Sequence, residues 1–278
     1  MKYGTYRRAT QLIVFGFMFL IPALNLFEIY LITGTYYAVS IGGLSIADPA
    51  VIVQAVFASG HVTISLVAAG LFSALLALLF GRVWCGWACP YHLVADAVNR
   101  IRRRVARREP PAPSWDGVAA FRANVTRFGF LVVGTFTAGV LAIPVLNFVS
   151  APGILSTEAM ILVKERTVSV EIGFIALLVV VELLVLPRFW CRLFCPTGSV
   201  LAVFRTPFTL HVATSIKTPK APCCKGNYCS AACPMGLSPF REGSNMLCTN
   251  CGRCIDACQA HGGPGGLRFA GFFFQGGA

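Results

Sequence analysis

A nine-residue pattern occurs twice in the chain, first as Arg82-Val83-Trp84-Cys85-Gly86-Trp87-Ala88-Cys89-Pro90 and again as Arg188-Phe189-Trp190-Cys191-Arg192-Leu193-Phe194-Cys195-Pro196. Both copies fit R-x-W-C-x3-C-P, and the second begins 106 residues after the first. Each copy directly follows a long apolar stretch. The repeat therefore predicts two helical hairpins in the same orientation, each ending in a pair of cysteines.

Working outward from the repeat, four apolar stretches are each about long enough to cross a bilayer as a helix. They cover residues 11–32, 62–80, 128–149 and 168–186. Of the 278 residues, 56% are hydrophobic and 12% are charged, whereas a soluble domain carries about 25% charged residues. This composition excludes an ordinary cytosolic enzyme and predicts an all-α polytopic membrane protein with four transmembrane helices.

The basic residues are distributed unevenly between the stretches. Three precede the first stretch, none lies in the 33–61 loop, nine lie between 82 and 127, two lie in the 150–167 loop and nine follow Leu186. The positive-inside rule then places both termini and both Cys pairs at the cytoplasmic face. The formal charge of +12 is accounted for by this topology, including an arginine-rich helix from Leu93 on the membrane surface, and no nucleic-acid partner is expected.

The strongest chemical signal is Cys248-x2-Cys251-x2-Cys254-x3-Cys258. Three thiolates at this spacing wrap one iron–sulfur cluster, and the fourth ligates the other cluster of a two-cluster ferredoxin. Zinc is the alternative, although zinc sites usually pair two separate C-x2-C knuckles. The pattern predicts a small C-terminal α+β ferredoxin-like domain.

The upstream half of this block is less regular. It contains Cys223, Cys224, Cys229 and Cys233, with Gly226 where a middle ligand is expected. On the ferredoxin exchange rule, Cys233 joins Cys248, Cys251 and Cys254 in one cluster. Cys258 joins Cys229 and Cys223 or Cys224 in the other, which is a [4Fe–4S] cluster, a [3Fe–4S] cluster or an empty site.

The two pairs at the membrane edge admit two readings. If the hairpins pack together, Cys85, Cys89, Cys191 and Cys195 converge as four soft ligands for a further cluster, or act as redox dithiols. The alternative is that all four are inert buried thiols.

Few ionisable side chains lie near the apolar stretches, where a charge is expensive and often functional. Glu28 and His61 flank one extracytoplasmic loop and together suit the acceptance of protons from a quinol, although His61 also suits a simple capping role. Glu182, near the inner end of the fourth stretch, suits either a proton path or helix packing.

The expected organisation has four parts. Residues 1–205 form the membrane domain, 206–222 a proline-containing linker, 223–266 the two-cluster domain and 267–278 a tail.

Taken together, the four stretches, the repeated R-x-W-C-x3-C-P, the sequence Ala58-Ser59-Gly60-His61 and the C-terminal cysteine block resemble the ferredoxin-type membrane protein family that contains the NapH and MauN proteins. The resemblance implies a multi-pass protein of the bacterial inner membrane that carries electrons by iron–sulfur clusters. It implies a link between the quinone pool and a partner iron–sulfur subunit that serves a periplasmic oxidoreductase, in nitrate reduction or methylamine utilisation. The family's ligands correspond here to Cys223, Cys229, Cys233, Cys248, Cys251, Cys254 and Cys258, and the eighth corresponds to Gly226.

Such a chain is expected to be an electron-transfer subunit of a quinol dehydrogenase and not a stand-alone enzyme. Two rival functions remain open. One is an assembly or maturation factor that uses the membrane-edge thiols to reduce a metal or a disulfide for a periplasmic enzyme. The other is a structural or metal-sensing membrane anchor without turnover.

Overall fold

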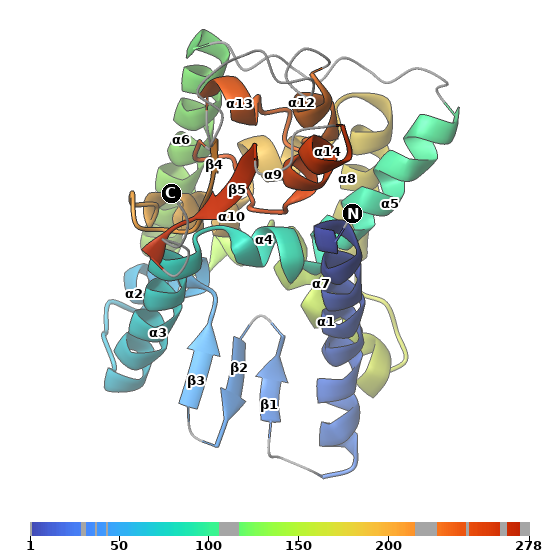
Figure 1. Ribbon diagram of the computed structural model, residues 1–278. Helices are drawn as coiled ribbons and strands as arrows, with labels where there is room; N and C mark the ends of the chain where they lie inside the picture. Colours follow the sequence, from blue (N-terminus) through green and yellow to red (C-terminus); the bar gives the residue numbers. More distant parts are fainter. Residues whose placement is uncertain are drawn as a thin grey trace.

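The computed structural model describes residues 2–28, 32–36, 38–42, 44–105, 117–214, 227–242, 245–261 and 266–272. Across these residues the chain is mostly helical and carries two small antiparallel sheets (Figure 1). The larger, N-terminal part holds α1 (Lys2–Leu26), β1 (Ile32–Thr35), β2 (Ala38–Ile41), β3 (Leu44–Ala47), α2 (Pro49–Ser59), α3 (Ile64–Phe80), α4 (Val83–Trp87), α5 (Pro90–Val105), α6 (Gly117–Leu141), the 3-10 turn η1 (Val145–Asn147), α7 (Ala151–Lys164), α8 (Ile172–Leu184), α9 (Phe189–Leu193) and α10 (Pro196–Val203). The C-terminal part holds β4 (His211–Thr214), α12 (Tyr228–Ala232), α13 (Pro239–Glu242), α14 (Arg253–Ala260) and β5 (Leu267–Ala270).

Two helices of the described chain are long and apolar enough to cross a membrane. These spans are Tyr3–Leu26 in α1 and Val118–Leu141 in α6. A third, broken span consists of Ile172–Leu184 and Phe189–Val203, which meet at an angle of 96°. Helix α3 is apolar throughout but has only 17 residues. The helices support a membrane protein, and the arrangement of four spans stays a prediction.

Two of the predicted stretches end earlier than expected. The first was expected over 11–32, but its helix ends at Leu26 and Ile32 begins a strand. The third was expected over 128–149, but α6 ends at Leu141. There, Ala142 takes a left-handed φ of 53°, and Pro144 has no backbone N–H with which to continue the helix.

A three-stranded sheet occupies the segment that the sequence pattern predicted to be a loop. Strands β1, β2 and β3 pair antiparallel in that order. The strands are rich in β-branched residues, which favour extended backbone. A tight turn at Gly42 joins β2 to β3, and its positive φ of 54° is a conformation that glycine adopts easily. One edge of the sheet packs on α1 and the other on α3, so the sheet fills the space between these two helices (Figure 1).

The two R-x-W-C-x3-C-P motifs have the same local structure. In each, a five-residue helix (α4 or α9) carries the Trp and the first Cys. The Trp carbonyl accepts bonds from the backbone N–H groups four and five residues later, at 2.9 Å in the first copy and 3.0 Å in the second. Pro90 and Pro196 then begin α5 and α10, a helix position that needs no N–H. Each proline thus starts a new helix directly after the second thiol.

The C-terminal unit has its own small core. Strands β4 and β5 pair antiparallel, and side chains from them pack with residues of α12 and α14. The paired strands lie in the segments that the sequence pattern assigned to the linker and the tail. Residues 211–214 and 267–270 therefore belong structurally to the C-terminal unit.

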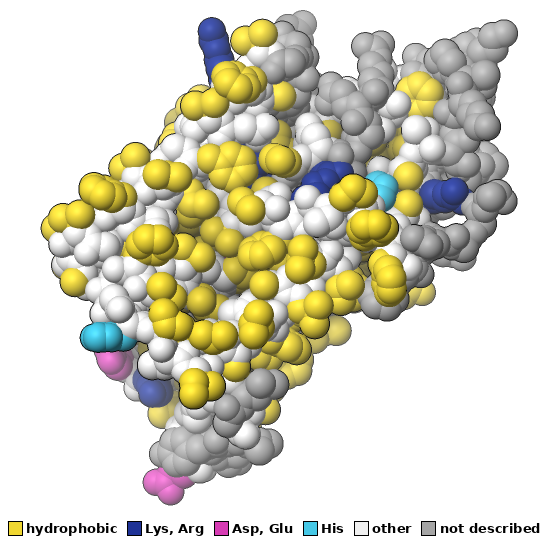
Figure 2. Space-filling model, turned by 90° about the vertical axis from the view of Figure 1, so that its left-hand side faces the viewer, with side chains coloured by type: hydrophobic (Ala, Val, Ile, Leu, Met, Phe, Trp, Pro, Cys, Tyr) yellow, Lys and Arg dark blue, Asp and Glu magenta, His cyan; other side chains and the backbone are white. Residues whose placement is uncertain are grey.

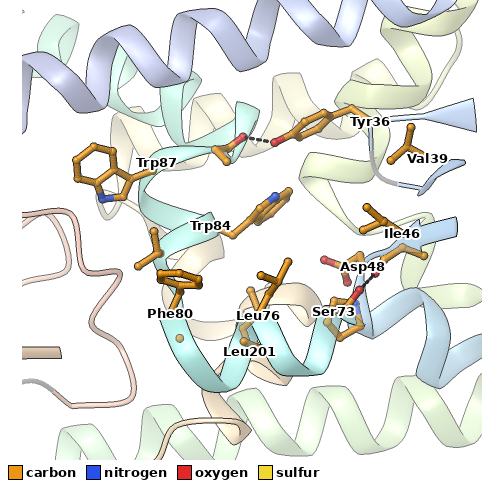
Figure 3. Close-up of a pocket in the computed structure, with 16 residues that line it drawn as sticks. Tyr36, Val39, Ile46, Asp48, Ser73, Leu76, Phe80, Trp84, Trp87 and Leu201 are labelled. Atoms are coloured by element: carbon orange, nitrogen blue, oxygen red, sulfur yellow. Dashed lines mark hydrogen bonds between the residues drawn. The ribbon is translucent and has the colours of Figure 1, made fainter. Parts of the chain in front are cut away.

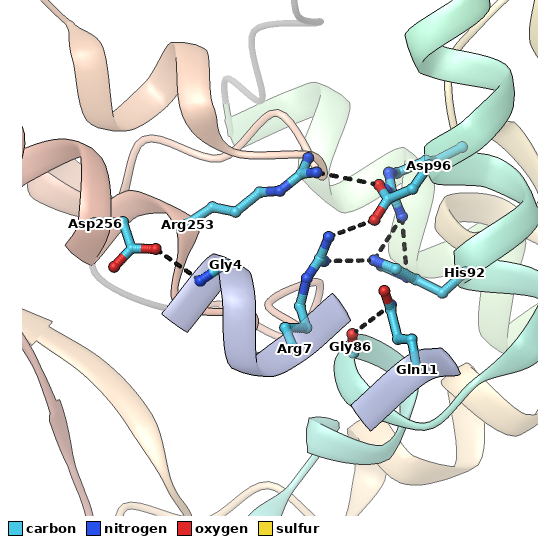
Figure 4. Close-up of polar contacts among 9 residues, drawn as sticks. Gly4, Arg7, Gln11, Gly86, His92, Asp96, Arg253 and Asp256 are labelled. Atoms are coloured by element: carbon cyan, nitrogen blue, oxygen red, sulfur yellow. Dashed lines mark hydrogen bonds and ion pairs between the residues drawn. The ribbon is translucent and has the colours of Figure 1, made fainter. Parts of the chain in front are cut away.

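A buried charge cluster joins this unit to the membrane helices (Figure 4). Asp96 of α5 forms ion pairs with Arg7 of α1 and with Arg188, and Arg253 of α14 approaches the same carboxylate at 3.5 Å. Burial lowers the pKa of His92, and Arg188 and Arg7 lower it further. With His92 neutral, one carboxylate faces three guanidinium groups.

Apolar side chains cover most of the molecular face that carries α2, α3 and α6 (Figure 2). In α3, the side chains of Ile64 and Leu71 are 90% and 66% exposed. In α6, Phe121 and Phe136 are 69% and 71% exposed. A contiguous apolar surface of this kind suits contact with lipid.

Candidate metal centres

The structure brings the four membrane-edge cysteines together. Cys85 and Cys191 lie on α4 and α9, and Cys89 and Cys195 directly precede α5 and α10. The thiol of Cys89 interacts electrostatically with those of Cys85 and Cys195, and Cys191 interacts with Cys89 and Cys195. Three of the four residues are buried and Cys191 is half-buried. The fold therefore brings the thiols of the two motifs close to one another.

Burial makes these thiols unfavourable places for unpartnered negative charge. It raises the pKa of Cys89, and the neighbouring thiols of Cys85 and Cys195 raise it further. Burial also raises the pKa of Cys85, while the guanidinium of Arg82 acts in the opposite direction. Crowded, buried thiols therefore lose their protons readily only when a metal cation binds to the sulfur atoms in place of the protons.

Buried arginines supply positive charge beside the same thiols. Arg82 and Arg127 are 4% and 1% exposed, and both reach Gly198, three residues after Cys195. Arg127 donates to the Gly198 carbonyl at 2.9 Å, and a Cβ atom on Gly198 would lie 2.7 Å from Arg82. Arg82 also donates to the Met246 carbonyl at 2.9 Å.

Among the described residues, no carboxylate forms an ion pair with Arg82 or Arg127. The Nε atom of Arg82 and one terminal nitrogen of Arg127 also lack hydrogen-bond partners there. A buried guanidinium without a counter-charge is costly. Thiolate ligands of a bound metal cluster would provide that negative charge, so the residues present fit such a group.

A second set of four thiols lies in the C-terminal unit. Cys233, Cys248, Cys251 and Cys254 line one small cavity, and the thiol of Cys254 interacts with the other three. Burial raises the pKa of Cys248 to about 12 and that of Cys233 to about 11. These are the four residues that the ferredoxin exchange rule groups around a single cluster.

The other expected ligand set is described only in part. Cys229 and Cys258 are buried in the same apolar cluster, against Val212 and Leu267. Cys223, Cys224 and Gly226 lie outside the described residues.

The two described thiol sets are packed directly against each other. A Cβ atom on Gly86, next to Cys85, would lie 2.4 Å from the Thr249 carbonyl oxygen and 3.5 Å from the Cβ of Cys251. Glycine at position 86 thus permits the close approach of the two backbones. Trp87 adds a hydrogen bond from its indole to the Asn250 carbonyl at 3.0 Å. On the other side, Cys191 packs against the same apolar cluster as Cys233 and Cys248.

Within the described residues, no three His, Cys, Asp or Glu side chains stand close enough to hold a single metal ion.

The three candidate proton-transfer residues occupy different surroundings. Glu28 and His61 are both exposed, and no hydrogen bond or ion pair joins these two described side chains. Glu182 is 3% exposed and accepts a hydrogen bond from the Tyr91 hydroxyl at 2.9 Å. Its carboxylate also interacts with Cys191, so Glu182 lies beside the membrane-edge thiols.

The sequence pattern did not identify the buried arginines or Asp96 as residues of the region around the membrane-edge thiols. Arg82 and Arg188 open the two copies of the repeat, and this shared position is the signal that would have found them. Arg127 and Asp96 carry no such signal, because their role depends on helices that meet only in the folded chain.

A family model described as "4Fe-4S binding domain" matches residues 62–109 and 168–210. Both membrane-edge Cys pairs lie within the matched residues. The chain is 28% identical to the ferredoxin-type protein NapH of Escherichia coli, over 91% of this chain and 85% of that protein. This chain is a relative of the ferredoxin-type proteins.

A second relative is the methylamine utilization ferredoxin-type protein MauN of Methylorubrum extorquens, 25% identical over 92% of this chain and 75% of that protein. The nitrogen fixation protein FixG of Rhizobium meliloti is 27% identical over 70% of this chain and 40% of its own length. No solved structure matches the chain. The match to the family model indicates that the chain binds a 4Fe–4S cluster, and its similarity to ferredoxin-type proteins points to iron–sulfur electron transfer.

Proposed function

We propose that the chain is a multi-pass inner-membrane electron relay that takes electrons from the quinone pool and passes them to a partner iron–sulfur protein. That partner would serve a periplasmic oxidoreductase, in nitrate reduction or in methylamine utilisation. The observation that carries the proposal is the direct packing of one thiol set on the other, across Gly86 and Thr249. Electron tunnelling falls steeply with distance, so two redox groups held this close exchange electrons rapidly.

In this proposal the two thiol sets hold separate clusters, and the cysteines of 223–229 with Cys258 hold a third. Bound iron–sulfur clusters supply one-electron transfer. The membrane-edge ligands are Cys85, Cys89, Cys191 and Cys195, and the C-terminal ligands are Cys233, Cys248, Cys251 and Cys254.

The residues around the ligands set how readily each site accepts an electron. Arg82 and Arg127 favour additional negative charge beside Cys85 and Cys195, and burial keeps water from screening that interaction. Positive charge near a cluster raises its reduction potential. The membrane-edge site is therefore suited to accept electrons from a donor in the bilayer.

The test is metal analysis of anaerobically purified full-length protein in detergent. Three clusters of four irons give about twelve iron atoms and as many acid-labile sulfides per chain, with reduced-cluster signals in low-temperature EPR. Cys89→Ser should lower the iron content to about eight and remove one set of signals. The control is Ala88→Ser, which adds a hydroxyl at the neighbouring position and leaves every thiol in place.

A chain that retains its thiols but contains zinc, or no metal, refutes the relay. The assembly-factor function would then be preferred, and Cys89→Ser should lower the cofactor content of the partner enzyme.

A further inference from the structure

A cavity of about 330 Å³ lies between the three-stranded sheet, α3 and α4 (Figure 3). Its volume lies within the range of small-molecule sites, about 300–1,000 Å³. None of the ten cysteines that the structure describes lines it, and the sequence pattern did not indicate it. Six of its lining residues carry the inference: Tyr36, Asp48, Ser73, Leu76, Phe80 and Trp84.

The walls of the cavity suit a flat, apolar ring. Tyr36 and Trp84 present nearly parallel ring planes, 15° apart, with their centroids separated by 6.2 Å. In Figure 3, Trp84 lies between Tyr36 on one side and Leu76 on the other. Aromatic faces of this kind bind planar conjugated ligands by offset stacking.

Polar groups stand at two separate places in this otherwise apolar lining (Figure 3). The Tyr36 hydroxyl donates to the Ala88 carbonyl at 3.2 Å. Away from it, the Ser73 hydroxyl donates to the Ala47 carbonyl at 2.6 Å, and the Asp48 carboxylate caps α2 by accepting from the Ala50 N–H at 2.7 Å. The hydroxyl protons of Tyr36 and Ser73 point to backbone carbonyls, those of Ala88 and of Ala47 or Ala69. The oxygen atoms at the two places therefore act as acceptors, which suits a ring that carries a hydroxyl group at each end.

The cavity is reached from the apolar surface of the protein. Leu76 and Phe80 line it and are also 41% and 38% exposed on α3. The apolar face in Figure 2 carries this helix. A ligand dissolved in the bilayer would therefore enter sideways, with an apolar tail left along α3.

The cavity also adjoins the membrane-edge thiols. Trp84 and Ala88 line it and directly precede Cys85 and Cys89. Ala77 and Leu201 also line it and pack against Cys85. Glu28 and His61, the pair that the sequence suggested for quinol chemistry, are absent from its described lining.

We propose that this cavity binds the ring of a membrane quinol, stacked on Trp84, with one quinol hydroxyl group donating to the Tyr36 oxygen and the other to Ser73 or to the Asp48 carboxylate. This inference rests on the proposed function, because it places the electron donor of the relay next to Cys85 and Cys89.

Direct binding tests the site. The full-length protein, reconstituted in quinone-free lipid nanodiscs, is titrated anaerobically with decylubiquinol while quenching of tryptophan fluorescence is followed. Val39→Phe fills the cavity from β2 and should weaken binding at least tenfold. Val67→Phe makes the same change in volume on α3, outside the cavity lining, and should leave the dissociation constant unchanged.

Two milder variants keep the test independent of folding. Tyr36→Phe removes one hydroxyl and should weaken binding about fivefold, as the loss of one hydrogen bond does. Asp48→Asn preserves the helix cap, because asparagine caps as well as aspartate does, and should weaken binding to a similar extent. Unchanged binding by Val39→Phe, or equal weakening by Val67→Phe, overturns the site.

Iron content measured on the same samples separates this inference from the function on which it rests. If the protein contains its iron but binds the ligand equally well with the cavity filled, the quinol site is refuted and the relay is not. If the protein contains no iron but binds the ligand saturably, and Val39→Phe weakens this binding, the relay is refuted and the binding site is supported.

Discussion

Replacing Asp96 with asparagine should destabilise the protein strongly, because this carboxylate holds the buried charge cluster together. Its side chain is 3% exposed and forms ion pairs with Arg7 and Arg188, and Arg253 stands 3.5 Å away. Asparagine has nearly the same shape but no charge. The substitution therefore leaves three guanidinium groups around a neutral amide, without opening a cavity.

The expected loss follows from the burial of the pairs. Removing one partner of a buried ion pair costs about 3–5 kcal/mol, since the remaining charge stays desolvated. For a chain of this size, 1 kcal/mol corresponds to about 2–4 °C in melting temperature, so a decrease of about 10 °C is expected. The matched control is Glu165→Gln, which neutralises an exposed carboxylate and should change the melting temperature by less than about 2 °C.

The assay is thermal unfolding of the purified protein in one detergent, followed by intrinsic fluorescence, with iron content measured on each sample. Limited proteolysis provides a second reading, because the cluster joins α14 to α1 and α5. Asp96→Asn should speed cleavage between the membrane helices and the C-terminal unit. A melting temperature within 2 °C of the wild type would show that the three arginines do not depend on this carboxylate.

Three further predictions concern neighbouring contacts. Burial alone would raise the pKa of Asp96, but the surrounding cationic groups outweigh burial and lower it. The ionised carboxylate therefore stabilises the protein above about pH 4, and this stabilisation is lost as the pH falls further. The difference in melting temperature between wild type and Asp96→Asn should narrow on acidification, and a constant difference would mean that the pKa is ordinary. Gly86→Ala places a Cβ atom 2.4 Å from a backbone oxygen of the C-terminal unit and should speed cleavage of that unit by a protease. The control Gly129→Ala, whose Cβ has no atom within 4 Å, should leave the cleavage rate unchanged. Equal cleavage rates for the two variants contradict the close approach at Gly86. Tyr91→Phe leaves the buried Glu182 without its 2.9 Å hydrogen bond and should lower the unfolding free energy by about 1–3 kcal/mol. Chemical denaturation measures this loss, and no loss is expected if a water molecule replaces the hydroxyl.

Local patterns predicted much of the secondary structure and the chemistry. The four apolar stretches overlap α1, α3, α6 and α8, and the arginine-rich segment from Leu93 is helical, as predicted, within α5. Helices α2 and α7 lie in segments that the pattern predicted to be loops. These patterns work because helix formation and membrane insertion depend on neighbouring residues. The same patterns misplaced the sheet of 32–47, since four-residue strands between glycines carry too short a periodicity to stand out.

The amino-acid sequence by itself predicted which residues hold metal, because the spacing of cysteines within each short motif sets which thiols are able to share a cluster. It also indicated the resemblance to the ferredoxin-type proteins, since the order of those motifs is kept along most of the chain. Only the tertiary structure decided which thiol sets meet. Gly86 and Thr249 are 163 residues apart, and their contact is held by partners distant in the sequence: Arg82 bonds to Met246, Trp87 to Asn250, and Asp96 pairs with Arg188 and Arg253. Long-range packing of this kind leaves no periodic trace in the sequence, which is also why the cavity beside Trp84 emerged only once the sheet was in place between α1 and α3.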